Sequence, residues 1–575
     1  MSVFYCFRSA LAGCALVSMS VVPLVCDVAP AQALTVASGP VAAPVTSTVA
    51  FNGIVNVLVL NNGGYSTVFT SPLTIVSIDT TGLKGVAKNL GDGRVAYNPM
   101  GKFNTLAAGQ TATDTFHYTV ADPQGRTATS TVTIVVTSGQ HASAVTADFA
   151  QPVYSAKLVG TLLSLNQSNP TSSQLSQIQS KYWRQGDASL YSRAVTMGAQ
   201  LEITLSEGWG YMNSTPAWGI HGAAPYGSAT NPDFTAWDAY VTSVAKANKA
   251  LSPNTVRYSI WNEPNWFYWQ NASLAETSPA YAQQMANLQY QTYLHAYRDL
   301  RAVLGPNVKI GGPSIGTFDL GYLKGFADFC VANGCQINFM TWHELVPDQH
   351  DRTIATTHLQ VFDETITNNS AYAALDLKER VVNEFMDQDD QYYPAELLAD
   401  LTYMENGGLN YASHACWNEP SGVSNCSTAG ASLDGFLTST YQPRANWWTA
   451  KFFSEMFFTA NSQRTFAQAT DPRIVARAAT ISTGPEVLVG YYGYDTTAMS
   501  PQSIALTMEH LSAYGYVPGQ TLKLTVLRAP NTADASVLSP PLVTSKTVQV
   551  SAAGSVQVVL PQIAPHEVLR VTVNP

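Results

Sequence analysis

Residues 258–269 contain a single carboxylate, Glu263, among several tryptophan and tyrosine side chains. Aromatic rings keep water away from a carboxyl group, and this loss of hydration disfavours its charged form and raises its pKa. A carboxyl group with a raised pKa can donate a proton at neutral pH, as general acid catalysis requires. The amide of Asn262 can hold a hydroxyl group of a substrate beside it. A Glu that only caps or pairs within a loop is the structural alternative.

The elements that must position Glu263 alternate between short apolar segments and longer helical ones over residues 146–465. Eight strands separated by helices predict a (β/α)8 TIM barrel, in which catalytic groups lie at the carboxyl ends of the strands. Glu263 follows the fourth expected strand, at that edge. The expected strands are 157–165, 181–185, 200–205, 256–261, 308–312, 337–342, 380–384 and 411–417, and expected helices include 233–250, 278–304 and 394–406.

Strand-rich regions flank the expected barrel on both sides. Residues 34–138 alternate apolar and polar positions and predict an N-terminal immunoglobulin-like β-sandwich. This segment resembles bacterial cadherin-like modules. Residues 139–145 are expected to form a linker, and residues 466–575 predict a C-terminal β-sandwich. The chain is therefore expected to be multidomain.

Residues 1–33 have the layout of a secretory signal peptide, with Arg8, an apolar run over 10–25 and a small-residue ending at Ala33. We expect a mature protein that is secreted or periplasmic. A lipoprotein cleavage site at Cys14 is the alternative. No other apolar run reaches the roughly 18 residues that cross a bilayer, so we expect no membrane span.

Four cysteines follow the expected signal peptide, and they form two close pairs. In an oxidising compartment this spacing predicts disulfides between Cys330 and Cys335 and between Cys416 and Cys426. A zinc site is the alternative, but zinc ligands usually come as C-x2-C pairs. The chain carries no Walker loop and no dinucleotide-binding fingerprint after a strand, so neither a cofactor nor a metal is expected.

The charge of the chain is sparse and acidic, with 29 Lys and Arg against 39 Asp and Glu and only 12% charged residues. Soluble domains usually contain about 25% charged residues. Nucleic acids require clustered cations, so we expect no nucleic-acid partner. All eleven Trp lie between Trp183 and Trp448, within the expected barrel. The oligomeric state is not indicated.

The sequence WNEPN at 261–265, followed by Trp269, resembles the acid/base motif of glycoside hydrolase family 39. The resemblance covers about 300 residues and implies a retaining (β/α)8 glycosidase that acts on an oligo- or polysaccharide. It assigns Glu263 as the acid/base and implies a nucleophile at the end of the seventh strand. There the sequence places Glu384, with Asn383 where the family more often has Thr. A structural role for Glu384 remains the alternative; other glutamates near expected strand ends or in helices are Glu344, Glu396 and Glu405.

The same resemblance implies several residues that contact the substrate or the nucleophile. His343 follows the sixth strand, where a family histidine lines the pocket, and Trp417 ends the eighth strand, where an aromatic floor lies under the sugar. Sugar rings have apolar faces that pack on an indole, which also suits Trp269 to a sugar groove. Arg184, at the end of the second strand, could hydrogen-bond the nucleophile.

These residues predict a secreted retaining glycoside hydrolase that works by double displacement through a covalent glycosyl-enzyme. Its expected substrate is a β-xyloside or a bacterial exopolysaccharide, with exo or endo action left open. Leu345 stands where the family commonly has Tyr, so the sugar is not fixed. The alternative function is a non-catalytic carbohydrate-binding or adhesion protein on a glycosidase scaffold.

Overall fold

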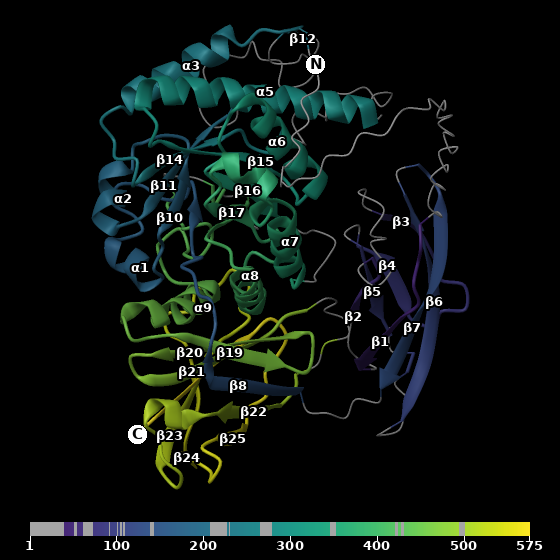
Figure 1. Cartoon of the computed structure of the whole chain (residues 1–575). Helices are drawn as coiled ribbons and strands as arrows, with labels where there is room; N and C mark the ends of the chain where they lie inside the picture. The colour runs from purple at the N-terminus through teal and green to yellow at the C-terminus, as the bar shows by residue number, and fades with distance from the viewer. Residues whose placement is uncertain are drawn as a thin grey trace, which may run out of the picture.

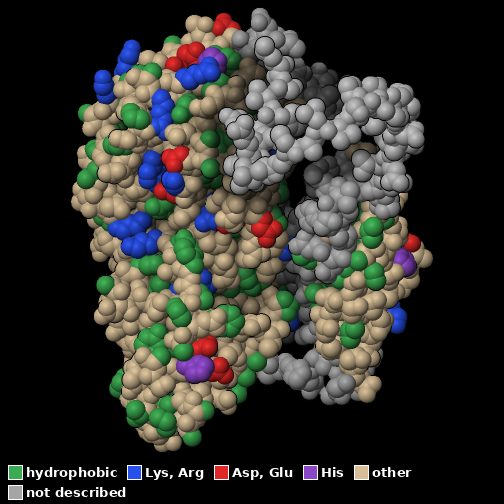
Figure 2. All heavy atoms as spheres, in the orientation of Figure 1, with side chains coloured by type: hydrophobic (Ala, Val, Ile, Leu, Met, Phe, Trp, Pro, Cys, Tyr) green, Lys and Arg blue, Asp and Glu red, His purple; other side chains and the backbone are tan. Residues whose placement is uncertain are grey.

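The structure is a computed structural model that describes most of residues 40–575 (Figure 1). The expected signal peptide and Trp269 lie outside the described residues. The gaps fall at 51–54, 61–72, 91–92, 100–101, 104–105, 107–109, 123, 138–142, 207–226, 229–230, 265–278, 346–351, 420–421, 423, 427–429, 494–498 and 500. Charged side chains are scattered over the face drawn in Figure 2, in keeping with the low charge of the sequence.

The N-terminal unit consists of two small sheets, which confirms the expected immunoglobulin-like sandwich. Strands β6 and β7 alternate buried and exposed positions, so that Phe116, Tyr118 and Ile134 point into the core. The sheets are β1-β7-β6-β3 and β2-β5-β4. Their strands are β1 (Val45–Ala50), β2 (Val55–Leu58), β3 (Thr74–Asp79), β4 (Val86–Asn89), β5 (Arg94–Asn98), β6 (Thr111–Ala121) and β7 (Thr127–Thr137).

The middle of the chain forms the expected barrel of eight parallel strands. The last strand lies beside the first, where the amide of His414 donates to the carbonyl of Gly160 at 3.3 Å, and this closes the barrel. The strands in order are β9 (Thr161–Leu162), β10 (Tyr182–Gln185), β11 (Gln200–Leu205), β14 (Val256–Ile260), β15 (Lys309–Ile315), β16 (Phe339–Glu344), β17 (Glu379–Phe385) and β18 (Tyr411–His414).

Helices surround the barrel and pack on it through one large apolar core (Figure 1). The described helices are α1 (Ser172–Gln177), α2 (Tyr191–Met197), α3 (Thr235–Ala247), α5 (Pro279–Leu304), α6 (Leu320–Asn333), α7 (Ile354–Phe362), α8 (Pro394–Asn406) and α9 (Ala445–Ser454), with short helical turns η3 (Asp363–Thr367), η4 (Ser370–Leu375) and η5 (Glu455–Phe458). The short strands β12 (Gly227–Ser228) and β13 (Asn231–Pro232) pair antiparallel. No described helix is both long and apolar enough to cross a membrane.

The C-terminal unit is a sandwich-like sheet of nine strands. Strands along its whole length contribute side chains to one apolar core. It packs on the barrel at α8, where Gly490 lies close to Ala395 and Leu398. The strands are β8 (Ser143–Pro152), β19 (Arg464–Ala469), β20 (Ile474–Ile481), β21 (Gly484–Tyr491), β22 (Ile504–Glu509), β23 (Thr521–Ala529), β24 (Leu542–Gln549), β25 (Val556–Val559) and β26 (Val568–Asn574), with a short turn η7 (Leu511–Tyr514).

Strand β8 corrects the boundaries expected from the sequence. Residues 143–145 were expected in the linker and residues 146–152 in the barrel, yet β8 pairs with β19 and β22 in the C-terminal sheet. Figure 1 shows β8 in the blue of the early chain among green and yellow strands. Its side chains Val145, Ala147 and Phe149 are buried in the core of that sheet, and this burial gives the pairing its driving force. The C-terminal unit is therefore assembled from both sides of the barrel.

Candidate active site

Glu263 lies just beyond the end of β14, a strand whose five residues are all buried. The backbone there is strained, because Trp261 has a φ of 78° and Glu263 a φ of 46°. The amide of Glu263 donates to the carbonyl of Ser314 at 2.8 Å and fixes this conformation. Burial raises the pKa of Glu263, and the nearby Arg184 opposes the shift in part. This is the direction that a proton donor needs.

Glu384 is the penultimate residue of β17, with only 12% of its side chain exposed. Nη1 of Arg184 donates to Oε1 of Glu384 at 2.5 Å. The strand ends that carry Glu263 and Glu384 meet at one edge of the barrel, as expected. One carboxylate oxygen of each, together with a ring nitrogen of His343, lie within 4.8 Å of one another.

His343 stands in β16 between the two carboxylates and is fully buried. Its Nδ1 lies 3.3 Å from Oε1 of Glu263, and its Nε2 lies 3.7 Å from Oε1 of Glu384. Burial lowers the pKa of His343 to about 4, although the charge of Glu384 opposes the shift. The imidazole is therefore neutral at neutral pH and separates the two carboxylates without adding a charge.

A buried hydrogen-bond network below the two carboxylates holds Arg184 in place. Its Nε donates to Glu202 at 3.0 Å, and its Nη2 donates to Oδ1 of Asn262 at 2.6 Å. Asn383 joins the network from β17 by donating to Glu202 at 3.1 Å and to the hydroxyl of Ser314 at 2.8 Å. Asn262 thus binds the arginine of the site through its side-chain oxygen.

Glu202 and Ser314 are site residues that the sequence reasoning missed. Glu202 sits fully buried within β11, between the buried Leu201 and Ile203. A charged residue inside a buried strand requires a partner, so its position in the sequence was a usable signal. Ser314 gave no such signal, because a serine in a strand is common.

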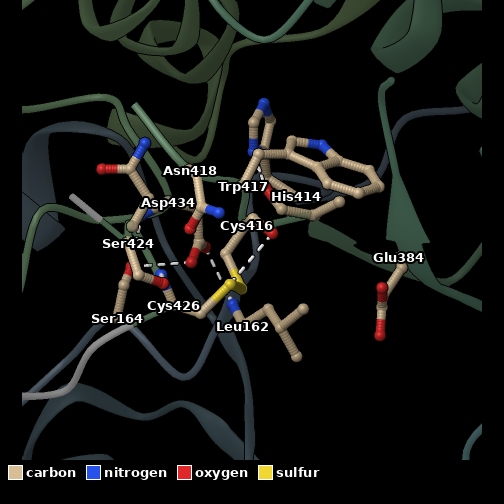
Figure 3. The surroundings of a disulfide bond; sticks show 12 residues. Leu162, Ser164, Glu384, His414, Cys416, Trp417, Asn418, Ser424, Cys426 and Asp434 are labelled. Carbon is tan, nitrogen blue, oxygen red and sulfur yellow. Dashed lines mark hydrogen bonds between the residues drawn. A yellow bond between two sulfur atoms is a disulfide. The ribbon is translucent and has the colours of Figure 1, made fainter. Parts of the chain in front are cut away.

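Trp417 follows β18 in a loop closed by a disulfide between Cys416 and Cys426 (Figure 3). Its indole Nε1 donates to the carbonyl of Met386 at 3.0 Å, two residues after Glu384. In Figure 3 the indole and the Glu384 carboxylate lie on the same side of the disulfide. The second expected disulfide, Cys330–Cys335, is also present at the end of α6.

The tryptophans serve the core more than the sequence suggested. Trp261, two residues before Glu263, is fully buried and packs edge-on against Trp237, with ring centroids 5.5 Å apart. Trp183 and Trp342 are equally buried. Among the described tryptophans, Trp417 is the one that adjoins the carboxylate pair from a loop.

The other candidate glutamates are engaged elsewhere. Glu344 accepts hydrogen bonds from Trp342 at 2.7 Å and lies 2.9 Å from His358. Glu396 lies 2.6 Å from His566 in the C-terminal sheet. Glu405 pairs with Arg464 and Arg477. These contacts give all three carboxylates structural partners, which leaves Glu263 and Glu384 as the pair at the strand ends.

Among the described residues, two groups of side chains have the composition of a metal site. One is Glu263 with His343 and Glu384, and the other is Asp148 with Glu509 and His510 on the C-terminal sheet. Carboxylate and imidazole are the donors that zinc takes in catalytic sites. In the first group Arg184 already donates a hydrogen bond to one oxygen of Glu384. The arrangement therefore also suits proton transfer by one carboxyl group and nucleophilic attack by the other.

Comparison with known proteins places both parts of the chain among known folds. Residues 37–135 match the family model "Bacterial Ig domain". N2152 from Neocallimastix frontalis has 17% sequence identity and a TM-score of 0.56, and the match covers 75% of this chain and 99% of that one. A glucosidase from Croceicoccus marinus has 12% identity and a TM-score of 0.52 over the same shares. No curated protein matches by sequence. The chain thus has distant structural similarity to glycoside hydrolases.

Proposed function

We propose that this protein is a retaining glycoside hydrolase with Glu384 as nucleophile and Glu263 as acid/base. The observation that carries the proposal is the short separation of the two carboxylates, which have oxygens within 4.8 Å of one another. Retaining enzymes hold their carboxyl groups about 5 to 5.5 Å apart, whereas inverting enzymes leave about 6.5 to 9.5 Å for a water molecule. Membership of glycoside hydrolase family 39 stays a prediction.

In the first step Glu384 attacks the anomeric carbon while Glu263 protonates the departing glycosidic oxygen, which gives a covalent glycosyl-enzyme. In the second step Glu263 removes a proton from water, and the water releases the sugar from Glu384. The hydrogen bond from Arg184 orients Glu384 and stabilises its carboxylate. The neutral His343 lies against both groups.

We further propose that the protein is exported and acts outside the cytoplasm, because its first 33 residues read as a signal peptide and its disulfides require an oxidising compartment. A β-xyloside or a bacterial exopolysaccharide is the proposed substrate. Trp417 is proposed as an aromatic floor for the sugar ring.

The test uses Glu263→Gln and Glu384→Gln with an activated aryl glycoside, and Glu344→Gln as the matched control. Each of the first two variants should lose most hydrolysis, because each lacks one of the two carboxylates. E344Q changes a neighbouring carboxylate that bonds to Trp342 and His358, so it should retain activity. Unchanged rates in both E263Q and E384Q would refute the assignment and favour a non-catalytic carbohydrate-binding protein.

A further inference from the structure

The loops that follow the eight barrel strands are strongly acidic. They contain many Asp and Glu residues but only two cationic residues, Arg352 and Arg444. Seven of the eight loops contain at least one Asp or Glu, and loop 163–171 contains no charged residue. The loops are 163–171, 186–190, 206–234, 261–278, 316–319, 345–353, 386–393 and 415–444.

Both arginines of these loops are buried and already paired. Arg352 is 6% exposed, donates to Asp400 at 2.6 Å and also pairs with Asp390. Arg444 is 3% exposed, donates to Glu419 at 2.8 Å and donates to the backbone carbonyls of residues 435 and 437. Both guanidinium groups therefore already have partners within the protein.

Two arginines in neighbouring elements, Arg184 of β10 and Arg193 of α2, also form hydrogen bonds or ion pairs within the protein. Arg184 binds Glu202, Asn262 and Glu384, as described above. Arg193 of α2 is 8% exposed and donates to backbone carbonyls of residues 166, 169 and 170. A bound carboxylate or sulfate would have to compete with these partners for a guanidinium.

Some carboxylates of the loops have arginine partners, as Asp390 has in Arg352 and Glu419 has in Arg444, but two in the loop after β17 form no ion pair with a described residue. Asp387 and Asp389 follow Glu384 by three and five residues, and Asp389 is exposed. The amide of Asp389 donates to the carboxylate of Asp387 at 3.0 Å, which orients that carboxylate without neutralising it. The loop after the proposed nucleophile therefore presents negative charge.

Cations gather at the opposite end of the barrel. Lys309 begins β15, and Arg380 lies next to the start of β17, where it pairs with Asp363 of η3. Lys378 immediately precedes β17, and Lys181 precedes β10. Three of these cations have carboxylate partners of their own, since Lys309 lies 3.5 Å from Glu379, Lys378 lies 2.8 Å from Asp376 and Arg380 pairs with Asp363. All four lie at or before the starts of strands, away from the strand ends that carry Glu263 and Glu384.

We infer that the site takes a glycan without carboxylate, sulfate or phosphate groups, an inference that rests on the proposed glycosidase function. An anionic sugar in such a site would lose hydration without gaining a cationic partner, and the acidic loops would repel it on approach. An uncharged sugar would meet hydroxyl-binding groups and the Trp417 indole without this cost.

The experiment compares matched 4-nitrophenyl glycosides in several sugar configurations, each as the neutral hexoside, the hexuronide and the hexuronamide. The amide has nearly the shape of the carboxylate but no charge. We expect kcat/KM for the uronide to be about 100-fold below that of its amide, since an unpaired buried charge is strongly disfavoured. A uronide hydrolysed as fast as its amide would overturn the inference and leave the proposed function standing. No hydrolysis across the whole panel would contradict the proposed function, and the inference would fall with it.

Charge variants give a second measurement on the full chain. Asp389→Lys places a cation beyond β17 and should raise the uronide-to-amide ratio of kcat/KM by about threefold or more. The control, Glu364→Lys, makes the same charge change on the exposed surface of η3, beside the Asp363 that pairs with Arg380 at the other end of the barrel. E364K should leave the ratio unchanged. Equal ratios in D389K, E364K and wild type would count against a charge-selective site.

Discussion

Replacing Arg184 with Met should damage stability and catalysis together. Arg184 is fully buried and is the shared cationic partner of Glu202 and Glu384. Methionine fills a similar volume but offers neither charge nor hydrogen bonds. R184M therefore leaves two carboxylates next to each other in the barrel without their counterion.

The size of the effect follows from these contacts. Removing one partner of a buried ion pair costs about 3–5 kcal/mol, because the remaining charge stays buried without compensation. In a domain of about 310 residues that loss corresponds to a fall in Tm of roughly 4–8 °C. Glu384 also loses the hydrogen bond that orients it, and a misplacement of about 1 Å in a reacting group costs about 100-fold in rate. We expect kcat/KM to fall by at least that factor.

The assay combines thermal unfolding with kcat/KM on an activated aryl glycoside for R184M, Arg184→Lys and the matched control Arg193→Met. Lysine keeps the charge but not the planar fork, so R184K should recover part of the stability and little of the activity. Arg193 is also buried but donates to neutral carbonyls, so R193M should lower Tm and leave kcat/KM close to the wild-type value. An R184M protein with the Tm and the kcat/KM of wild type would refute this reasoning.

Two further predictions concern pH and the disulfides. Burial raises the pKa of Glu263, and Glu263 can donate a proton only while its carboxyl group is protonated. We therefore expect kcat/KM to decline on the alkaline side as pH rises through that pKa. The pH profile of E263Q should lack this decline; a limb that survives there would belong to another group. Replacing Cys416 and Cys426 with Ser should cost about 2–3 kcal/mol of stability through loop entropy and also raise KM, because the loop carries Trp417. The same replacement of Cys330 and Cys335, at the far end of α6, should lower Tm without a change in KM, and equal KM values for both double variants would argue against a substrate contact in the Trp417 loop.

The local sequence pattern was sufficient to predict the barrel and the proximity of Glu263 and Glu384. Each barrel strand is a short apolar run, and parallel strands bring their carboxyl ends to one edge, so Glu263 and Glu384 had to lie near each other. The pairing of β8 with β19 and β22 could not be predicted in this way. Residues Ser143 and Asp471, which meet across this sheet, are 328 positions apart, and periodicity carries no information on so distant a partner.

Asn383 shows what a motif comparison leaves out. The sequence presented it as a departure from the Thr expected before the nucleophile. In the structure its amide bridges Glu202 and Ser314, two residues that no motif singled out. The side chain is explained by its buried partners on neighbouring strands, and these become visible only when the barrel is closed. Asn383 therefore has buried partners of its own beside the two carboxylates.

Backbone strain supports the site on grounds independent of any motif. Trp261, Glu263, Ser314 and Met386 all have positive φ at the ends of β14, β15 and β17, and such residues cost about 1–3 kcal/mol each. Ser314 holds these ends together: its carbonyl accepts from the amide of Glu263, its own amide donates to Thr341 at 2.8 Å, and its hydroxyl accepts from Asn383. A fold keeps strain of this size only where surrounding bonds enforce it. Here those bonds converge on the two strand ends that present Glu263 and Glu384, which supports the proposal that this edge of the barrel is the catalytic site.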